Sequence, residues 1–301
     1  IMVQRILGHF GFWKGIWYSL FHSISAFCNA GFDLIGIRTP FSSLTSYSVQ
    51  PIVNLVIMAL IVAGGIGFLT WEDIKNHKWH FKKYRMQSKV IFMVTGILIF
   101  LPALYFFYFE FSNVPLTERV WVSLFQSVTP RTAGFNTADL TLLSEVGQML
   151  IIMLMLIGGS PGSTAGGMKT TTVLVLLVST WGLLHGKRDT VLFDRRIASE
   201  TVDKAYNVFT VCLLWMLGAY FLLLICDGGL HRADYVLFEV VSAFATVGLG
   251  VGITPDWNDW GKLILVLTMY AGRIGVLTFV LSFLHSKDDK IRYPSENIMI
   301  G

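Results

Sequence analysis

The stretch Trp17-Tyr-Ser-Leu-Phe-His-Ser-Ile-Ser-Ala-Phe-Cys-Asn-Ala-Gly-Phe32 decides how the rest of the chain is interpreted, because similar stretches occur twice more. The other two are Trp121-Val-Ser-Leu-Phe-Gln-Ser-Val-Thr-Pro-Arg-Thr-Ala-Gly-Phe135 and Tyr235-Val-Leu-Phe-Glu-Val-Val-Ser-Ala-Phe-Ala-Thr-Val-Gly-Leu249. Each begins with an aromatic residue, ends in Gly followed by Phe or Leu, and is shorter than the roughly 20 residues that span a bilayer. The first and third share the ungapped frame Phe-x-x-x-Ser-Ala-Phe-x-[Asn/Thr]-x-Gly, whereas the second is one residue shorter before its Gly.

The composition places these segments in a membrane protein. Hydrophobic residues make up 54% of the chain and charged residues 14%, with a mean hydropathy of +0.62. A soluble domain is typically about a quarter charged, so this chain could not cover its surface in water. The net charge of +4 gives no reason to expect a nucleic-acid partner. The three cysteines, Cys28, Cys212 and Cys226, lack metal-ligand spacing and are expected to be buried free thiols.

Long apolar stretches follow or precede each of the three segments. Four of them are long enough to cross a bilayer: Val49–Leu69, Val90–Phe109, Ala205–Ile225 and Lys262–Leu284. A fifth, Val146–Leu184, is too long for one span and is interrupted by Gly158–Gly167. Of the 23 Lys and Arg residues, 14 lie in the connections 71–89 and 185–204 and after residue 284. By the positive-inside rule, these connections and the C-terminus are cytoplasmic.

The spans that follow the segments repeat as well. Ala63-Gly-Gly-Ile-Gly-Phe-Leu-Thr70 matches Ala271-Gly-Arg-Ile-Gly-Val-Leu-Thr278 at six of eight positions. We therefore expect an all-α membrane protein built from helix, re-entrant pore loop and helix, a unit that is complete at 90–184 and 205–284. It lacks its first helix at 17–70. With the connections included, the corresponding divisions are 1–89, 90–204 and 205–301.

Each segment has the features of a cation filter. The C-terminal end of a short helix carries about half a negative charge, and extended residues after it can offer carbonyl oxygens in place of water. Gly permits the backbone angles that aim a carbonyl inward. The alternative is an interfacial helix with Gly as its C-cap, but three such segments in register, each followed by a span, favour the filter. The candidate filter residues are Asn29, Ala30, Gly31, Thr132, Ala133, Gly134, Thr246, Val247 and Gly248.

The interruption in the fifth apolar stretch is rich in Gly, Pro and hydroxyl residues, which cannot continue a lipid-facing helix and must line a cavity. A phosphate-binding loop is disfavoured, because Met168 separates Gly167 from Lys169 and no strand precedes the segment. We interpret it as a movable gate below the filter. The candidate gating residues are Gly158, Gly159, Ser160, Pro161, Gly162, Ser163, Thr164, Ala165, Gly166, Gly167 and Lys169, together with Arg273.

Polar residues in apolar surroundings are assigned as follows. Arg273 stands alone in its span and either repels cations or holds the gating loop by its carbonyls, or else pairs with a carboxylate. Arg131 would oppose conduction if it faced the ion, so we expect its head to turn behind the filter. His22, Gln126 and Glu239 form one column of the three segments and are expected to satisfy neighbouring groups. For Lys169, the alternative to gating is snorkelling toward the cytoplasmic surface.

The motifs at 21–32, 129–136 and 158–170 resemble the Trk/Ktr/HKT superfamily of potassium transporters, most closely the bacterial Ktr-type membrane subunit. The resemblance implies four repeats around a pseudo-fourfold pore, with potassium at the backbone carbonyls of Gly31, Gly134 and Gly248. It implies that 158–169 is the gating loop and Arg273 the inner-helix arginine near it. The three segments correspond to repeats two to four, so repeat one is absent and we expect a C-terminal portion of a longer chain.

The resemblance also implies a function and partners. It implies potassium uptake across the bacterial plasma membrane, with a sodium-permeable or sodium-coupled transporter of the same superfamily as the alternative. It further implies a homodimer on a cytosolic RCK-type (KtrA-like) regulatory ring that binds ATP or ADP, and no cofactor besides the bound ion. A membrane enzyme is disfavoured because His22, His185 and His231 have no triad-like neighbours. A scaffold protein would leave the intramembrane glycines unexplained.

Overall fold

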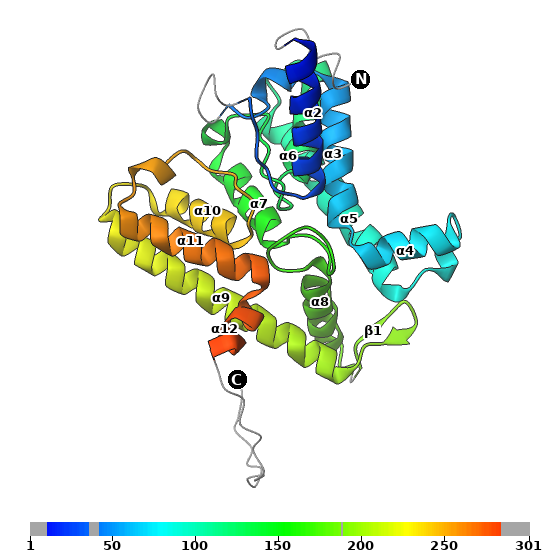
Figure 1. Ribbon diagram of the computed structural model, residues 1–301. Helices are drawn as coiled ribbons and strands as arrows, with labels where there is room; N and C mark the ends of the chain where they lie inside the picture. The colour runs from blue at the N-terminus through cyan, green and yellow to red at the C-terminus, as the bar shows by residue number, and fades with distance from the viewer. Residues whose placement is uncertain (1–10, 36–41, 188, 284–301) are drawn as a thin grey trace.

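The computed structural model describes residues 11–35, 42–187 and 189–283, and their regular secondary structure is almost entirely helical (Figure 1). Helices Met86–Glu110 and Ser199–Asp227 are each long and apolar enough to cross a membrane, and two sharply bent helix pairs also qualify if each is one span. The predicted all-α membrane fold is therefore confirmed. The C-terminal tail, with Lys287, Lys290 and Arg292, lies outside the described residues.

The helices follow one another along the chain with connections of very different length. The α-helices are α2 (Phe12–Phe27), α3 (Pro51–Gly65), α4 (Phe68–His77), α5 (Met86–Tyr105), α6 (Leu116–Val128), α7 (Glu145–Leu156), α8 (Thr170–Leu184), α9 (Ser199–Asp227), α10 (Ala233–Phe244), α11 (Asp259–Ile274) and α12 (Val276–Phe283). The π-helical η3 (Phe106–Glu110) continues α5, and η1 (Thr45–Tyr47), η2 (Phe81–Lys83), η4 (Leu140–Leu142) and η5 (Thr254–Asp256) are single turns. A small antiparallel hairpin of β1 (Val191–Leu192) and β2 (Arg195–Arg196) lies in the connection between α8 and α9 and is an exception to the predicted all-α fold.

The expected repeat is visible as helix, short helix and helix. It comprises α5, α6 and α7, then α9, α10 and α11, whereas α2 and α3 form a unit without its first helix. Two of the third helices begin with the same device. The Ser144 hydroxyl accepts a hydrogen bond from the Gly147 amide at the start of α7, and Asn258 Oδ1 accepts one from the Gly261 amide at the start of α11. These caps satisfy amides that have no partner within the helix.

Two of the predicted continuous spans are broken, which corrects the sequence-based expectation. The span 49–69 bends by 98° between α3 and α4, and the span 262–284 bends by 103° between α11 and α12. The breaks fall at Gly67 (φ 86°) and Gly275 (φ 100°), conformations that side chains rarely adopt. With the interruption between α7 and α8, the inner helix of each unit is thus broken at a corresponding place.

Burial separates the short helix α10 from the long helices α5 and α9. Helix α10 buries Val236, Phe238, Val240, Val241 and Phe244 to within 2% of full burial. Helices α5 and α9 instead expose large apolar residues, among them Leu101, Leu104, Phe221 and Ile225. Apolar side chains exposed along helices of spanning length are the surface that lipid covers. Helix α10 is therefore enclosed by the protein, whereas α5 and α9 present apolar faces to lipid.

The loops at the end of α9 are tied by one buried carboxylate. Asp227 accepts hydrogen bonds from the His231 amide (2.9 Å) and from Trp257 Nε1 (3.0 Å), and its Oδ1 lies 2.6 Å from His231 Nδ1. The hydrogen bond with Asp227, reinforced by the charges of Asp227 and Asp256, outweighs burial and raises the pKa of His231 above its ordinary value. The cluster joins the start of the α10 segment to the loop before α11.

This cluster predicts a pH-dependent stability. Because His231 binds its proton more tightly when folded, its stabilisation is complete below the unfolded pKa of about 6.5 and is lost as the pH rises through the raised folded pKa. We expect the Tm of the full-length protein in detergent to fall between roughly pH 6 and pH 9. The fall should be about 2 °C larger in the wild type than in His231→Gln. An equal fall in both proteins would contradict the assignment.

Candidate ion pathway

The candidate filter segments form the same turn three times. Asn29, Thr132 and Thr246 stand two residues before the Gly of their segments and have positive φ angles of 48°, 66° and 55°. Positive φ is an outlier for a β-branched residue such as Thr and is held only where the surroundings enforce it. The glycines follow at 70° for Gly31, 81° for Gly134 and 86° for Gly248. Three strained turns of one pattern indicate one shared task for the backbone.

The first and third turns agree in their hydrogen bonds as well. The Ala30 amide donates to the Ser25 carbonyl and the Val247 amide to the Ser242 carbonyl, both at 2.9 Å. In the second turn the Ala133 amide donates to the Thr129 carbonyl at 3.0 Å, one residue closer. This matches the single-residue deletion seen in the sequence.

The turns lie against one another although more than 100 residues separate them along the chain. A Cβ atom on Gly31 would collide with the Ala133 carbonyl oxygen and lie 3.1 Å from the Gly134 Cα. A Cβ atom on Gly134 would collide in the same way with the Val247 carbonyl oxygen, whereas Gly248 faces open space among the described residues. Each turn therefore contacts the next in chain order, and any side chain at the first two glycines would push the turns apart.

The polar column holds the chain that leaves each turn. The Leu34 amide donates to His22 Nε2 (3.3 Å), and the Val251 amide donates to Glu239 Oε1 (3.0 Å). Leu34 and Val251 each stand three residues after a filter glycine. In the second segment Gln126 Nε2 donates to Asn136 Oδ1 at 3.0 Å. The side chains thus satisfy neighbouring groups, as expected.

Arg131 is turned away from the other two turns. It is 4% exposed, and its Nη2 donates to Thr95 Oγ1 of α5 at 3.2 Å. The guanidinium therefore reaches back toward the outer helix of its own unit.

The candidate gating loop is hydrogen bonded to the break after α3. The Ser160 amide donates to the Gly65 carbonyl (3.0 Å) and the Thr164 amide to the Gly64 carbonyl (3.3 Å). In return the Phe68 amide, which begins α4, donates to the Gly162 carbonyl at 2.9 Å. Backbone groups that α3 and α4 leave free at their junction are satisfied by the loop, and the loop's own amides are satisfied by α3.

The same loop touches all three candidate filter segments. The Thr164 hydroxyl donates to the Phe27 carbonyl at 2.9 Å. A Cβ on Gly158 would lie 3.1 Å from Thr132 Cγ2, and one on Gly167 would lie 3.2 Å from Ala245 Cα. Figure 1 shows the loop between α7 and α8 in the middle of the molecule, between the ends of the short helices. Its glycines let it lie directly against the candidate filter.

Two cations lie beside this loop. Lys169 Nζ donates to the Ala165 carbonyl at 2.7 Å, and Arg273 is close enough to Lys169 for their charges to repel. Arg273 is exposed, and within the described part of the chain no carboxylate pairs with it. The predicted alternative of a carboxylate partner is therefore not observed there, and Lys169 belongs to the loop rather than to the surface.

Two glycines against which the short helices α2 and α10 end were not predicted from the sequence. A Cβ on Gly64 would collide with the Phe27 carbonyl oxygen, and one on Gly272 would collide with the Phe244 carbonyl oxygen. Gly64 and Gly272 are equivalent in the matched octapeptides, as are Phe27 and Phe244 in the repeated frame. The octapeptide match was the available signal, because it preserves both these glycines and the hinge glycines Gly67 and Gly275.

Comparison with known proteins places this arrangement in a family. Residues 12–293 match the family model described as "TrkH: Cation transport protein". The chain belongs to the TrkH family. This confirms the resemblance drawn from the motifs at 21–32, 129–136 and 158–170. The family is one of cation transport proteins and not of enzymes, as the sequence predicts.

Individual relatives of the TrkH family cover most of the chain. Potassium/sodium uptake protein NtpJ of Enterococcus hirae is 40% identical over 302 residues, which are 97% of this chain and 66% of NtpJ. Ktr system potassium uptake protein B of Bacillus subtilis is 38% identical over 309 residues, which are 100% of this chain and 67% of that protein. The chain thus spans about two thirds of the length of the curated relatives it matches.

A solved structure of the family has the same fold. The potassium transporter TrkH from Vibrio parahaemolyticus superposes with a TM-score of 0.72 at 19% sequence identity, over 94% of this chain and 68% of the TrkH chain. At this identity the match supports the fold alone.

The helix-to-filter packing predicts a strong position dependence of Gly→Ala substitutions. We expect Gly272→Ala to destabilise the full-length protein by roughly 1–3 kcal/mol, because the new methyl group meets the Phe244 backbone. Gly96→Ala in α5 is the matched control, since a Cβ there meets nothing within 4 Å and Ala favours helix. Thermal unfolding in detergent measures both, and equal Tm values for the two variants would refute the packing.

Proposed function

We propose that the full-length protein is a potassium uptake pore and that this chain supplies three of its four filter segments. The ion binds at backbone carbonyls of the three turns, at Gly31, Gly134 and Gly248 and the residues before them. The observation that carries this proposal is the mutual contact of three strained, equivalent turns. The transported ion, potassium in this proposal and sodium in the alternative below, is the only bound group that the proposal requires.

The electrostatics of the three segments suit a cation. Helices α2, α6 and α10 each end at a turn, so the partial negative charge of each C-terminus lies beside the filter. Carbonyl oxygens replace the hydration shell of the ion. A fourth segment, from the part of the longer protein that precedes this chain, completes a pseudo-fourfold ring with Gly248 and Gly31 at its open sides. The divisions at 89/90 and 204/205 follow from this repeat and stay predictions.

The loop 158–169 acts as the gate under this filter. It closes the path because it contacts all three filter segments and is hydrogen bonded to the junction of α3 and α4. Lys169 and Arg273 place two positive charges beside the closed loop, where they disfavour a cation. To open, the loop must break the backbone hydrogen bonds that the amides of Ser160, Thr164 and Phe68 make across it. Its glycines allow the change of conformation.

Partners and orientation follow from charge and family. The basic connections 71–89 and 185–204 and the C-terminus lie in the cytoplasm of a bacterial cell. Two subunits form a homodimer on a cytosolic RCK-type ring that binds ATP or ADP, and that ring controls the loop. The name "Ktr system" of several relatives supports a multi-subunit assembly of this kind.

A sodium-permeable or sodium-coupled transporter is the second candidate. This alternative is supported by the name of the Enterococcus hirae relative, which is a potassium/sodium uptake protein. Flux of sodium with no flux of potassium or rubidium in liposomes would establish this alternative and exclude the first.

The filter proposal is tested by Gly248→Ser in the full-length protein. Serine at φ 86° strains the turn and moves its carbonyls. We expect the KM for rubidium uptake into liposomes to rise by about tenfold, equivalent to roughly 1.4 kcal/mol of ion binding. Gly252→Ser is the matched control, because Gly252 has φ 89° and equally open space but lies beyond the turn. Equal KM changes in both variants would show a general strain effect and not a filter.

The gate proposal is tested by removing Gly162–Ala165 from the loop. This deletion takes away the Thr164 amide, the Gly162 carbonyl and their bonds to α3 and α4. We expect rubidium flux to increase several-fold while ion selectivity is kept. A loss of flux in protein that keeps its wild-type Tm would assign the loop a structural role in permeation.

A further inference from the structure

Two hollows meet on the side of the molecule that carries the basic connections. One, of about 330 Å³, lies between the α4–α5 connection and the β1–β2 hairpin and is lined by His77, Lys82, Lys83, Tyr84, Lys89 and Arg195. The other, of about 370 Å³, lies between α5, α8 and α9 and is lined by Gln87, Val90, Leu174, Val175, Ala205 and Val208. Met86 lines both, so the two hollows adjoin. We call the first the basic pocket and the second the apolar groove.

The basic pocket carries uncompensated positive charge. No Asp or Glu lines it, and among the described residues neither Lys82, Lys83 nor Arg195 has a carboxylate partner. Lys89 Nζ donates to the Lys82 carbonyl at 3.0 Å, and no carboxylate in the described ranges pairs with it. Several cations around one small volume repel one another unless an anion lies between them.

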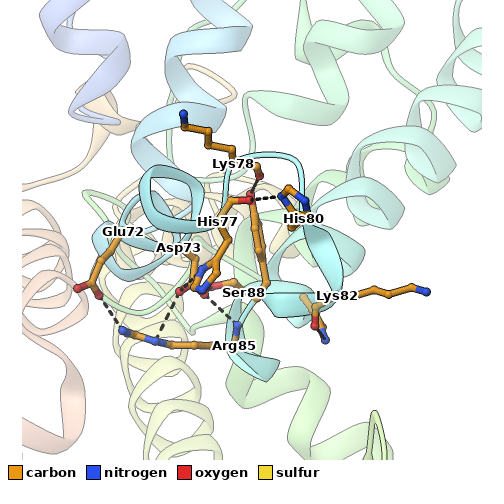
Figure 2. Close-up of polar contacts among 10 residues, drawn as sticks. Glu72, Asp73, His77, Lys78, His80, Lys82, Arg85 and Ser88 are labelled. Atoms are coloured by element: carbon orange, nitrogen blue, oxygen red, sulfur yellow. Dashed lines mark hydrogen bonds and ion pairs between the residues drawn. The ribbon is translucent and has the colours of Figure 1, made fainter.

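The carboxylates near the basic pocket are already used. Arg85 Nη2 lies 3.0 Å from Glu72 Oε2, and Arg85 Nε lies 3.5 Å from Asp73 Oδ1. Asp73 also accepts a hydrogen bond of 2.6 Å from the Ser88 hydroxyl, so this cluster is closed on itself (Figure 2). On the other wall, Asp189 binds Arg196 at 2.9 Å rather than the neighbouring Arg195.

The hairpin forms a wall of both hollows. Leu192 and Ile197 line the apolar groove, whereas Phe193 and Arg195 line the basic pocket. In Figure 1 the hairpin lies below α4 and beside the lower end of α8. One ligand with an anionic end and an apolar end would therefore contact the hairpin along both walls.

The apolar groove leads from the basic pocket to the candidate gating loop. Thr201, Ala205 and Val208 lie on one stripe of α9, since their spacing of four and three residues follows the helical repeat. Leu174 and Val175 of α8 face them across the groove, and Pro161 of the loop lines it as well. The groove is apolar enough to hold a hydrocarbon chain.

The surroundings of the basic pocket are those of a membrane interface. Trp79 is 97% exposed and Phe81 is 49% exposed in the same connection as Lys82 and Lys83. Exposed aromatic residues beside Lys residues are typical of the level of lipid headgroups.

We propose that the basic pocket and the apolar groove together bind one anionic phospholipid. Its phosphate lies among Lys82, Lys83, Lys89 and Arg195, and one acyl chain fills the groove up to Pro161. A soluble phosphate compound would use the pocket but leave the groove unexplained. The lipid also supports the closed position of the loop, a consequence that rests on the proposed gate, whereas binding itself does not.

Binding is tested with full-length protein in detergent, by titrating phosphatidylglycerol and counting bound lipids by native mass spectrometry. We expect the triple variant Lys82→Gln, Lys83→Gln, Arg195→Gln to weaken one binding event at least about tenfold. The control variant Lys75→Gln, Lys78→Gln, Lys187→Gln removes the same charge on the same side but outside the pocket, and should bind as the wild type does. Val175→Trp, which fills the groove, should weaken the same event.

Several results would overturn the proposal. One is an equal loss of lipid binding in the control variant. Two others are equal binding of phosphatidylcholine and unchanged lipid binding by Val175→Trp. Full displacement of the lipid by ATP or inorganic phosphate would show that the site binds a soluble anion. A groove covered by another part of the chain or by a second copy would show no lipid at all.

Rubidium flux separates this proposal from the proposed function. In liposomes containing phosphatidylglycerol we expect the triple variant to conduct severalfold faster than the wild type, and in pure phosphatidylcholine the difference should disappear. Lipid binding without any cation flux would support the lipid site and refute the proposed pore. Flux that ignores both lipid and variant would refute the link from the site to the loop.

Discussion

The structure depends on one constraint: backbone amides and carbonyls inside a membrane must find hydrogen-bond partners in the protein itself or in an enclosed, water-filled path. The three turns at residues 29–31, 132–134 and 246–248 are non-helical, so their backbone groups cannot be satisfied within a helix. They are satisfied because the short helices, the polar column and the neighbouring turns surround them. Glu239, for example, accepts from the Val251 amide and from the Thr254 hydroxyl, so that the chain leaving the third turn has buried partners.

The same constraint explains where the glycines stand. Backbones that satisfy one another must approach closely, and Gly31, Gly134, Gly64 and Gly272 are each placed where a methyl group would strike a carbonyl oxygen. The loop 158–167 packs as closely, since a methyl group on Gly64 would also lie 2.9 Å from the Thr164 hydroxyl oxygen. The candidate filter, the candidate gating loop and the helix breaks are therefore one packed arrangement of backbone.

Much of this arrangement could be predicted from periodicity alone. The three segments, their register and the one-residue deletion in the second became three turns with matching φ angles and matching hydrogen bonds. The polar column at His22, Gln126 and Glu239 also follows, because a polar residue at one position of three apolar helices needs a partner close by. Composition and the positions of Lys and Arg identified the membrane class without further help.

The rest depends on contacts that sequence spacing does not reveal. The predicted spans 49–69 and 262–284 are apolar apart from a few polar residues such as Arg273. Their hydropathy does not indicate the breaks of 98° and 103°, which are marked only by the paired glycines Gly67 and Gly275. Likewise, the two hollows form from the connections at 77–89 and 191–197, which are far apart in sequence and share no motif. Tertiary packing alone brings Arg195 beside Lys82.

The most direct test of the central claim is the position of a bound cation in the full-length protein. Crystals grown in thallium or rubidium should show an anomalous peak on the axis between the backbone carbonyls at Gly31, Gly134 and Gly248, and potassium should displace it. An ordered structure of the same protein without density at these carbonyls, or with the ion bound elsewhere in the membrane region, would contradict the account.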